Sequence, residues 1–271
     1  MHKQLTWLLA FLVMAVACSR NPYKATNKVY KKESKRLAKT LRQYPLEGIS
    51  SDSIVTPPYF VGTTNFNLRK PNFVIIHHTA QNSCEQTLRT FTLSRTQVSA
   101  HYVICEDGTL HQMLNDYFRA WHGGVSKWGN LTDINSSSIG IELDNNGFEP
   151  FTEPQIKSLL LLLNRLKVKH GIPTANFIGH SDIAPTRKND PNIYFPWKQL
   201  AEQGYGLWYD DTTSIAVPDN FDHLLALRIV GYDMRDTTAA IRAFKRHFAQ
   251  DSTHNFNDAD RKILYMLVRK F

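Results

Sequence analysis

The chain has 271 residues, of which 42% are hydrophobic and 21% charged, and its formal net charge is +8. This composition excludes a disordered or fibrous chain and is typical of a globular protein with one medium-sized domain and a smaller unit beside it. A chain of this length buries a core large enough to be stable in water.

The N-terminal segment is typical of an export signal. A basic start precedes an apolar run over residues 7–17, and small residues stand directly before Cys18. At 11 residues the run is too short to span a bilayer. The letters AVAC that end at Cys18 resemble the lipobox of bacterial lipoproteins, although that family more often has leucine where Ala15 stands. We therefore predict a lipoprotein signal peptide over residues 1–18 with lipidation of Cys18; a cleaved signal with an incidental cysteine is the alternative.

Positive charge is concentrated in residues 20–42, where nine Lys and Arg residues accompany one acid, Glu33. Lys3 adds one more positive charge, so the rest of the chain has a net charge of −1. Since a nucleic-acid-binding protein spreads basic residues over its folded face, we expect no nucleic acid partner. Residues 19–56 are instead predicted to be a basic tether that supports the lipid anchor by attraction to anionic head groups. Ser19 after the lipid cysteine is compatible with sorting to the outer membrane, so we expect the protein there, facing the periplasm. A solvated linker helix is an equally good interpretation of the basic segment.

Two further cysteines, Cys84 and Cys105, remain once Cys18 is lipidated. Two are too few for a disulfide framework. They can pair in an oxidising envelope or stay reduced and buried, and the sequence favours neither outcome.

The first part of the folded domain is predicted to be rich in strands. Residues 46–72 are a Pro- and Ser-rich connector, with folded structure starting near Pro57. Short β-branched runs then predict central strands over residues 72–76, 99–105 and 138–143. The Asp107-Gly108 turn after the second run predicts a hairpin over residues 99–113.

Helical patterns dominate the rest of the chain. Residues 152–170 have leucines at helical spacing, a Thr152/Gln155 capping pair and Gly171 behind the end. Further helices are predicted over residues 84–94, 221–230, 238–248 and 258–271. Together these elements predict an α/β fold, with a mixed central sheet covered by helices over residues 57–205 and a small three-helix domain over residues 206–271 that leans on it.

The stretch GHSDIAPTRKND, residues 179–190, contains hardly any core-forming residue, which indicates a functional loop. His180 and Asp190 lie ten residues apart across Pro185 and would meet only if the loop folds around something such as a metal ion. A catalytic zinc needs a third protein ligand. FVIIHHTA can supply one, because His77 and His78 follow a buried strand, although a His-His pair is weak evidence when taken alone.

Five motifs occur in order along residues 72–197: IIHHTA, SAHYVI, AWHGG, SIGIELDNNG and GHSDIAPTRKNDPNIYFPW. With them the chain resembles the zinc-dependent N-acetylmuramoyl-L-alanine amidases, the family that includes phage amidases and peptidoglycan recognition proteins. It is most similar to the lipoprotein amidases of Gram-negative envelopes. The resemblance implies that zinc is bound by His77, His180 and Asp190, with a packing or hydrogen-bonding role for His78. One branch of the family has cysteine as the third ligand, where this chain has Asp190.

The resemblance also assigns the remaining catalytic roles. Glu142 matches the family's catalytic glutamate. It lies in an apolar strand, where a carboxylate without a role or a partner would be costly. The resemblance implies that Glu142 carries a proton from the attacking water to the leaving amine. Lys188 would stabilise the oxyanion together with zinc. Trp121, His122 and Arg187 are predicted substrate contacts, with a structural role as the alternative for Arg187.

These residues predict a monomeric envelope enzyme that cleaves the amide between N-acetylmuramic acid, ordinary or 1,6-anhydro, and the L-alanine of the stem peptide. The C-terminal domain resembles three-helix peptidoglycan-binding domains, and its expected surface contacts are Tyr232, Arg242, Lys245 and Arg246. The alternatives are an inactive peptidoglycan binder and a zinc peptidase acting within the stem. The retained Asp190 argues against the binder, and the lack of an H-E-x-x-H motif argues against the peptidase.

Overall fold

A computed structural model describes residues 21–42 and 62–270 of the chain. The predicted signal peptide, Cys18 and the expected start of the fold near Pro57 lie outside these residues. The chain separates into two compact units, Met1–Phe66 and Asn67–Phe271. Between residue 62 and the first strand the connector has neither helix nor strand, as predicted.

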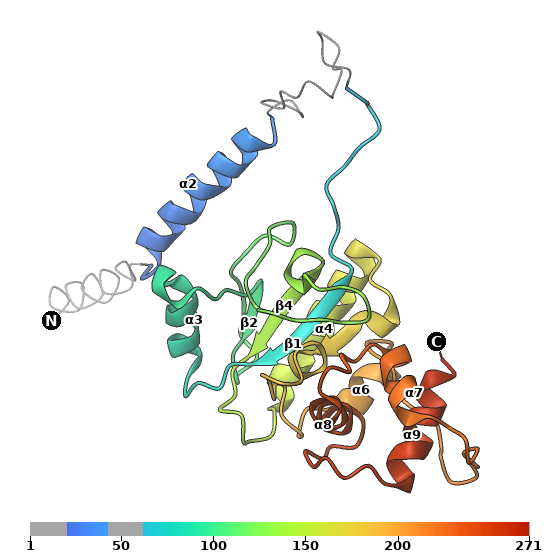
Figure 1. The fold of residues 1–271 in the computed structure, drawn as a ribbon. Coiled ribbons are helices and arrows are strands. Elements are labelled where there is room, and N and C mark those ends of the chain that lie inside the picture. Colours follow the sequence, from blue (N-terminus) through green and yellow to red (C-terminus); the bar gives the residue numbers. More distant parts are fainter. Residues whose placement is uncertain (1–20, 43–61, 271) are drawn as a thin grey trace, which may run out of the picture. The chain divides into compact units, whose positions relative to one another are not determined.

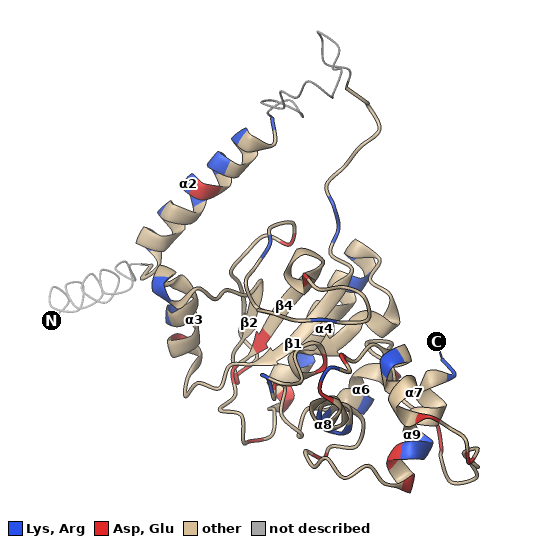
Figure 2. Cartoon of the chain, in the orientation of Figure 1, with Lys and Arg blue, Asp and Glu red and all other residues tan. Residues whose placement is uncertain are grey.

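The described part of the tether is a helix, α2 (Lys24–Thr40), which buries none of its residues. Seven basic residues and one acid lie along it, and Figure 2 shows the basic positions as blue segments of the helix ribbon. None of the helices in the described ranges combines the length and apolar character that a bilayer crossing requires.

A five-stranded mixed sheet forms the centre of the second unit, in the order β3-β2-β4-β1-β5. Figure 1 labels its central strands β2, β4 and β1. Its strands are β1 (Phe73–His78), β2 (Tyr102–Ile104), β3 (Leu110–Gln112), β4 (Ser138–Leu143) and β5 (Phe177–Gly179). The pairs β1/β4, β1/β5 and β2/β4 are parallel, whereas β2 and β3 form the antiparallel hairpin that the Asp-Gly turn predicts. The three predicted strands and the mixed sheet are confirmed, while the three-residue β5 was not predicted.

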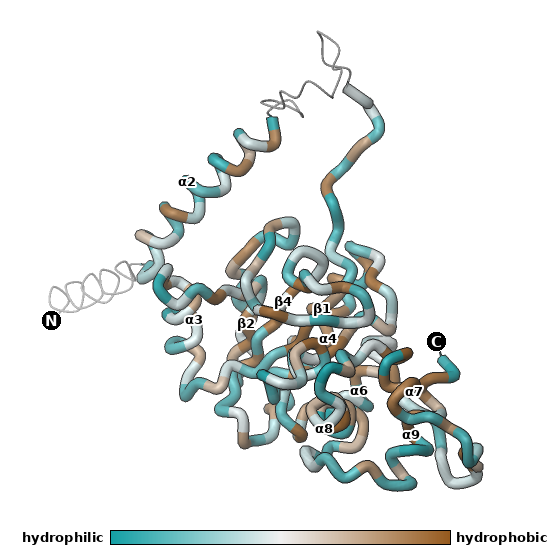
Figure 3. The backbone as a smooth tube through the Cα atoms, in the orientation of Figure 1, coloured by the Kyte–Doolittle hydropathy of each residue, from teal (hydrophilic) through white to brown (hydrophobic). Residues whose placement is uncertain are grey.

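The central strands are mostly apolar because both faces of the sheet are covered. Every residue of β1 and β4 is buried, and Figure 3 shows these strands as hydrophobic stretches. Helix α4 (Glu153–His170) packs its leucines against the sheet in the largest core cluster. Its ends follow the predicted signals: the Thr152 hydroxyl accepts from the Gln155 N–H, and Gly171 ends the helix in the left-handed conformation at φ 67°.

Shorter helices surround this centre. They are α3 (Cys84–Thr92), α5 (His180–Ile183), α6 (Trp197–Glu202) and the 3-10 turns η1 (Ser94–Thr96), η2 (Ile134–Ser136) and η3 (Thr174–Asn176). A disulfide joins Cys84 to Cys105 and so ties the start of α3 to the end of β2. The question that the sequence left open is thus answered in favour of pairing.

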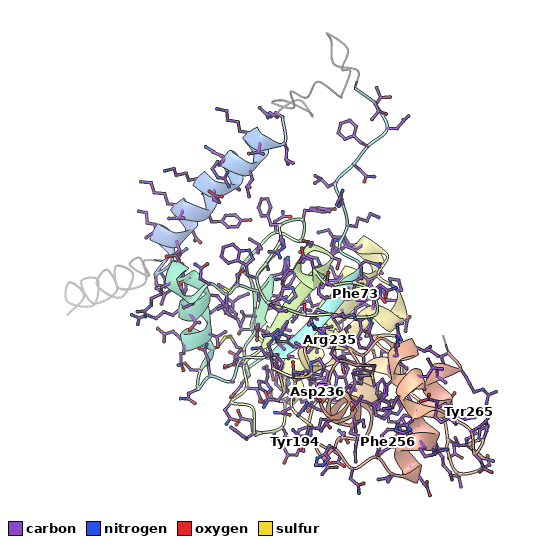
Figure 4. All side chains as sticks on the ribbon, viewed as in Figure 1. Phe73, Tyr194, Arg235, Asp236, Phe256 and Tyr265 are labelled. Carbon is purple, nitrogen blue, oxygen red and sulfur yellow. A yellow bond between two sulfur atoms is a disulfide. The ribbon has the colours of Figure 1, made fainter. Side chains whose placement is uncertain are left out.

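The predicted C-terminal helices are α7 (His223–Val230), α8 (Thr237–Phe248) and α9 (Asp258–Val268). They enclose a second apolar cluster in which the Phe244 ring meets Phe256, a residue labelled in Figure 4. These helices belong to the same compact unit as the sheet, and α8 contacts both α5 and α6.

Two of the expected surface contacts in this helical part are wrong. Tyr232 and Lys245 are each 2% exposed. The Lys245 ammonium lies 2.8 Å from an Asp251 carboxylate oxygen and 3.2 Å from one of Asp260, so the charge is paired inside the fold. A sequence pattern does not distinguish such a lysine from a solvated one. Arg242, which is exposed, and Arg246, which is half-buried, remain candidates for glycan contact.

Candidate metal site

Three side-chain atoms from distant parts of the chain converge at one edge of the sheet. His77 Nδ1 lies 2.9 Å from His180 Nδ1, and Asp190 Oδ2 lies 3.0 Å from each of these nitrogens. All three side chains are buried. Adjacent ligands of a tetrahedral zinc with bonds of ~2.0–2.1 Å are ~3.3 Å apart, so a small outward movement would open a site of that size. The structure therefore brings together the three residues predicted as metal ligands.

Parallel strand pairing explains how the two histidines meet. Ile76 of β1 is paired with Gly179 of β5, and His77 and His180 are the next residues of the two segments. They therefore leave the sheet side by side at the carboxyl ends of neighbouring strands. The loop then returns, and the Ser181 N–H donates to the Asp190 carbonyl at 2.8 Å, which brings the carboxylate back to the histidines.

A chain of hydrogen bonds fixes the tautomer of His77. The Ser138 hydroxyl donates to the Ile134 carbonyl at 2.7 Å, so Ser138 Oγ accepts from His122 Nε2 at 3.1 Å. His122 Nδ1 then has a free lone pair and accepts from His77 Nε2 at 3.1 Å. This leaves the lone pair of His77 Nδ1 directed at the candidate site.

His180 is oriented in the same way by a backbone carbonyl. Its Nε2 lies 3.3 Å from the Gly123 oxygen, which only accepts, so this nitrogen donates and Nδ1 keeps its lone pair. Burial and the neighbouring His180 lower the pKa of His77 to about 4. Although burial alone would raise the pKa of Asp190, the imidazoles of His180 and His77 hold that pKa well below its usual range. Two imidazole nitrogens with free lone pairs and one carboxylate oxygen thus meet, and these are the donor forms that bind a metal ion.

Glu142 stands next to the three converging atoms. It is the partner of His77 in the β1/β4 register, and its Oε1 lies 4.0 Å from His77 Nδ1. Burial and the Asp190 carboxylate raise the pKa of Glu142 well above its ordinary value, and the charge of Lys188 partly opposes this. A carboxyl group whose pKa is raised in this way holds a proton more readily than an exposed carboxylate, which suits it to proton transfer.

The other predicted site residues occupy different environments. Lys188 is exposed two residues before Asp190 and acts electrostatically on Glu142. Arg187 donates to the carbonyls of Gly123 and Val125, so its guanidinium braces a neighbouring loop, in agreement with the structural alternative. Trp121 is 49% exposed and remains free for a substrate contact.

His122, expected to contact the substrate, is instead buried, with its two ring nitrogens bonded to His77 and Ser138. Its imidazole supports a predicted ligand from behind. Gly140 of β4 is the signal that points to this arrangement, because a Cβ there would lie 2.4 Å from the His122 ring. An isolated glycine inside a strand often marks such a close approach.

Two further contacts were missed by sequence reasoning. The Asn192 N–H donates to His78 Nδ1 at 3.1 Å, so His78 holds the segment that follows Asp190, a role of the kind expected for it. Ser138 ends the hydrogen-bond chain behind His77. Neither contact has a local signal, because each joins residues that are far apart along the chain.

Comparison with known proteins decides the family. The family described as N-acetylmuramoyl-L-alanine amidase matches residues 67–193. The N-acetylmuramoyl-L-alanine amidase AmiD of Escherichia coli is 33% identical over 230 residues, which cover 73% of this chain and 82% of AmiD. The chain belongs to the N-acetylmuramoyl-L-alanine amidase family. Membership confirms the resemblance seen in the five motifs and makes the chain an amidase.

Other amidases extend this comparison. The 1,6-anhydro-N-acetylmuramyl-L-alanine amidase AmpD of Haemophilus influenzae is 40% identical over 104 residues, 38% of this chain and 56% of AmpD. A structure of E. coli AmiD with anhydro-N-acetylmuramic acid-L-Ala-D-gamma-Glu-L-Lys has a TM-score of 0.68 and 29% identity, covering 84% of this chain and 97% of AmiD. AmpDh3 of Pseudomonas aeruginosa has a TM-score of 0.69 and 28% identity, covering 80% and 98%. The aligned parts of this chain, 84% and 80% of its length, are longer than residues 67–205, so the structural similarity includes the C-terminal helices.

Proposed function

We propose that this amidase is zinc-dependent and hydrolyses the amide between N-acetylmuramic acid and L-alanine of peptidoglycan fragments, with His77, His180 and Asp190 as the metal ligands. The observation that carries the proposal is the convergence of two imidazole nitrogens and one carboxylate oxygen, 2.9 to 3.0 Å apart, in a buried site. Two nitrogens and one oxygen are a donor set that catalytic zinc sites use, with the fourth position left open.

The residues around the ligands have the properties that the reaction needs. When bound, zinc would supply a Lewis acid and lower the pKa of a coordinated water. Glu142 takes the proton of the attacking water and passes it to the leaving amine, a task that suits a carboxyl whose pKa is raised by burial and by Asp190. Lys188 places a positive charge at the rim of the site, where it can stabilise the oxyanion of the tetrahedral intermediate.

We extend the proposal to 1,6-anhydro muropeptides as substrates in cell-wall recycling. AmiD, which shares most of its length with this chain, has been solved with an anhydro-muropeptide, and AmpD is named for action on the anhydro sugar. Both relatives support the anhydro form of the sugar, a choice that the sequence leaves open.

The test is digestion of muropeptides by metal-stripped protein with and without added zinc. We expect free stem peptides beginning with L-alanine, together with peptide-free sugar, only when zinc is present. Asp190→Ala should abolish the reaction, and parallel digests of anhydro and ordinary muropeptides decide the sugar preference. Cleavage within the stem would indicate a peptidase, and binding without product would indicate a recognition protein; either result contradicts the proposal.

We further propose that lipidated Cys18 and the basic helix α2 hold the protein at the outer membrane, on its periplasmic side. Cys18 lies outside the described residues, and the exposed Lys and Arg of α2 support attraction to anionic head groups, at ~1 kcal/mol for each basic residue near the surface. Membrane fractionation of wild-type protein and of Cys18→Ser tests the anchor. Equal distribution of the two between membrane and soluble fractions would refute it.

A further inference from the structure

A buried carboxylate lies two residues beyond one of the predicted metal ligands. Asp182 belongs to α5, the four-residue helix that begins with His180, and it is 1% exposed. A carboxylate buried to this extent requires hydrogen-bond donors, since removing it from water without them costs several kcal/mol. The source of its donors shows what holds this turn in place.

Two of the three donors to Asp182 come from the C-terminal helical part. The Tyr232 hydroxyl donates to Oδ1 at 2.8 Å, and His247 Nδ1 donates to Oδ2 at 2.7 Å. The third is the Gly179 N–H, which donates to Oδ2 at 2.7 Å and closes the first turn of α5. Tyr232 and His247 lie 50 and 65 residues beyond Asp182, so the contact exists only in the assembled fold.

Ring packing supports the same contact. The His247 ring lies flat on Trp197, with centroids 3.9 Å apart and planes at 13°. Trp197 is itself tight against the start of α5, because a Cβ on Gly179 would lie 3.1 Å from its ring. The imidazole of His247 is therefore fixed between Trp197 and the Asp182 carboxylate.

The same helical part reaches His180 by a second, independent route. The Gly129 N–H donates to the Gly231 carbonyl at 2.7 Å, and a Cβ on Gly231 would lie 2.5 Å from the Trp128 ring. Trp128 belongs to the loop that begins at Gly123, whose carbonyl accepts from His180 Nε2 at 3.3 Å. Residues 231 and 232 thus contact both the turn that carries His180 and the loop that orients its imidazole.

We infer that Tyr232 and His247 position His180 for metal binding, and that the C-terminal helical part is a structural component of the metal site in addition to any role in binding glycan. The inference rests on the proposed function, because the contacts matter only if His180 is a ligand. A single-turn helix has too few internal hydrogen bonds to set its own orientation, so tertiary contacts must do so. Tyr232 and His247 supply those contacts as positioning residues without touching the metal or the substrate.

Two ring-conserving variants of the full-length protein test the inference. Tyr232→Phe keeps the ring contact with Trp128 and removes one donor, and His247→Phe keeps a ring to stack on Trp197 and removes the other. We expect each to weaken the zinc Kd on the order of tenfold, the lower end of the effect of removing a group that supports a ligand. Zinc alone is the probe, measured by competition with a chromophoric chelator, and thermal unfolding is recorded for each variant.

Asp251→Asn is the matched control. Asp251 follows α8 and contacts Lys245, which lies on the same helix as His247, and Thr253, so its contacts lie within the C-terminal helical part. It should lower thermal stability while leaving the zinc Kd at the wild-type value. Wild-type affinity in both phenylalanine variants would overturn the inference, as would an equal loss of affinity in the control. If the wild-type protein binds no zinc, the proposed function itself fails. If the wild-type protein binds zinc and both phenylalanine variants bind it equally well, only the positioning inference fails.

Discussion

Replacing His122 by phenylalanine should weaken zinc binding although His122 touches no metal. The variant keeps a ring of similar size beneath Gly140 but removes the nitrogen that accepts from His77 Nε2 at 3.1 Å. His77 then has a buried N–H without a partner, or it moves its proton to Nδ1 and blocks the lone pair that should bind the metal.

The size of the effect follows from the role of the hydrogen bond. Removing a group that orients a metal-bound histidine typically costs 10- to 100-fold in metal affinity, which corresponds to ~1.4–2.7 kcal/mol. Burial of both imidazoles favours the upper half of this range, because water does not readily replace the lost acceptor. His122→Gln, which retains a side-chain acceptor, should recover part of the loss.

The assay is competition for zinc with a chromophoric chelator, with unfolding followed in parallel. His101→Phe is the matched control: His101 is another buried histidine, its ring lies 6.0 Å from that of His122, and it bonds to Phe118 and Gly140 rather than to His77. It should destabilise the fold without changing the zinc Kd. Unchanged affinity in His122→Phe, or the same loss in His101→Phe, would refute the reasoning.

Three further changes test other parts of the structure. Glu142→Gln should lower kcat by roughly 10²- to 10⁴-fold and leave the zinc Kd close to wild type, since it removes the proton carrier and keeps the ligands; parallel losses in both quantities would contradict its role. Burial alone would raise the pKa of Asp116, but hydrogen bonds from Lys169, Tyr102 and His170 lower it to about 2. The stability that this carboxylate contributes is therefore present above pH ~4 and is lost as the pH falls through about 2. In urea titrations at different pH values, Asp116→Asn should reduce the acid-dependent part of the free energy of unfolding by about 1 kcal/mol, a value that allows for solvent screening at the partly exposed Lys169. Replacing Cys84 and Cys105 by serine should lower the free energy of unfolding by ~3 kcal/mol, because the disulfide closes a loop with a sequence separation of 21. The same guanidinium midpoint in the wild type and the double-serine variant would show that the cross-link does not stabilise the fold.

Local patterns along the chain were sufficient for most of the fold. The capping pair and the terminal glycine predicted α4 to within one residue at its start, and β-branched runs predicted β1 and β4. Strand β5 was missed because its three residues have neither the longer apolar run that marked β2 nor the Asp-Gly turn that marked β3. Lys245 was misplaced because a helical pattern shows spacing but not which charged side chain finds two carboxylates inside the fold.

The sequence by itself predicted the central strands through their periodicity, and its motifs carried the family resemblance that pointed to the three residues whose donor atoms meet at the sheet edge, since motifs and periodicity are local properties. The tertiary structure alone decided what holds those donors: His122 behind His77, the Gly123 carbonyl behind His180, and Tyr232 with His247 on Asp182. These contacts join residues that lie far apart along the chain. Which of them form depends on how parallel strands and the C-terminal helices pack, and packing brings together groups that no local pattern relates.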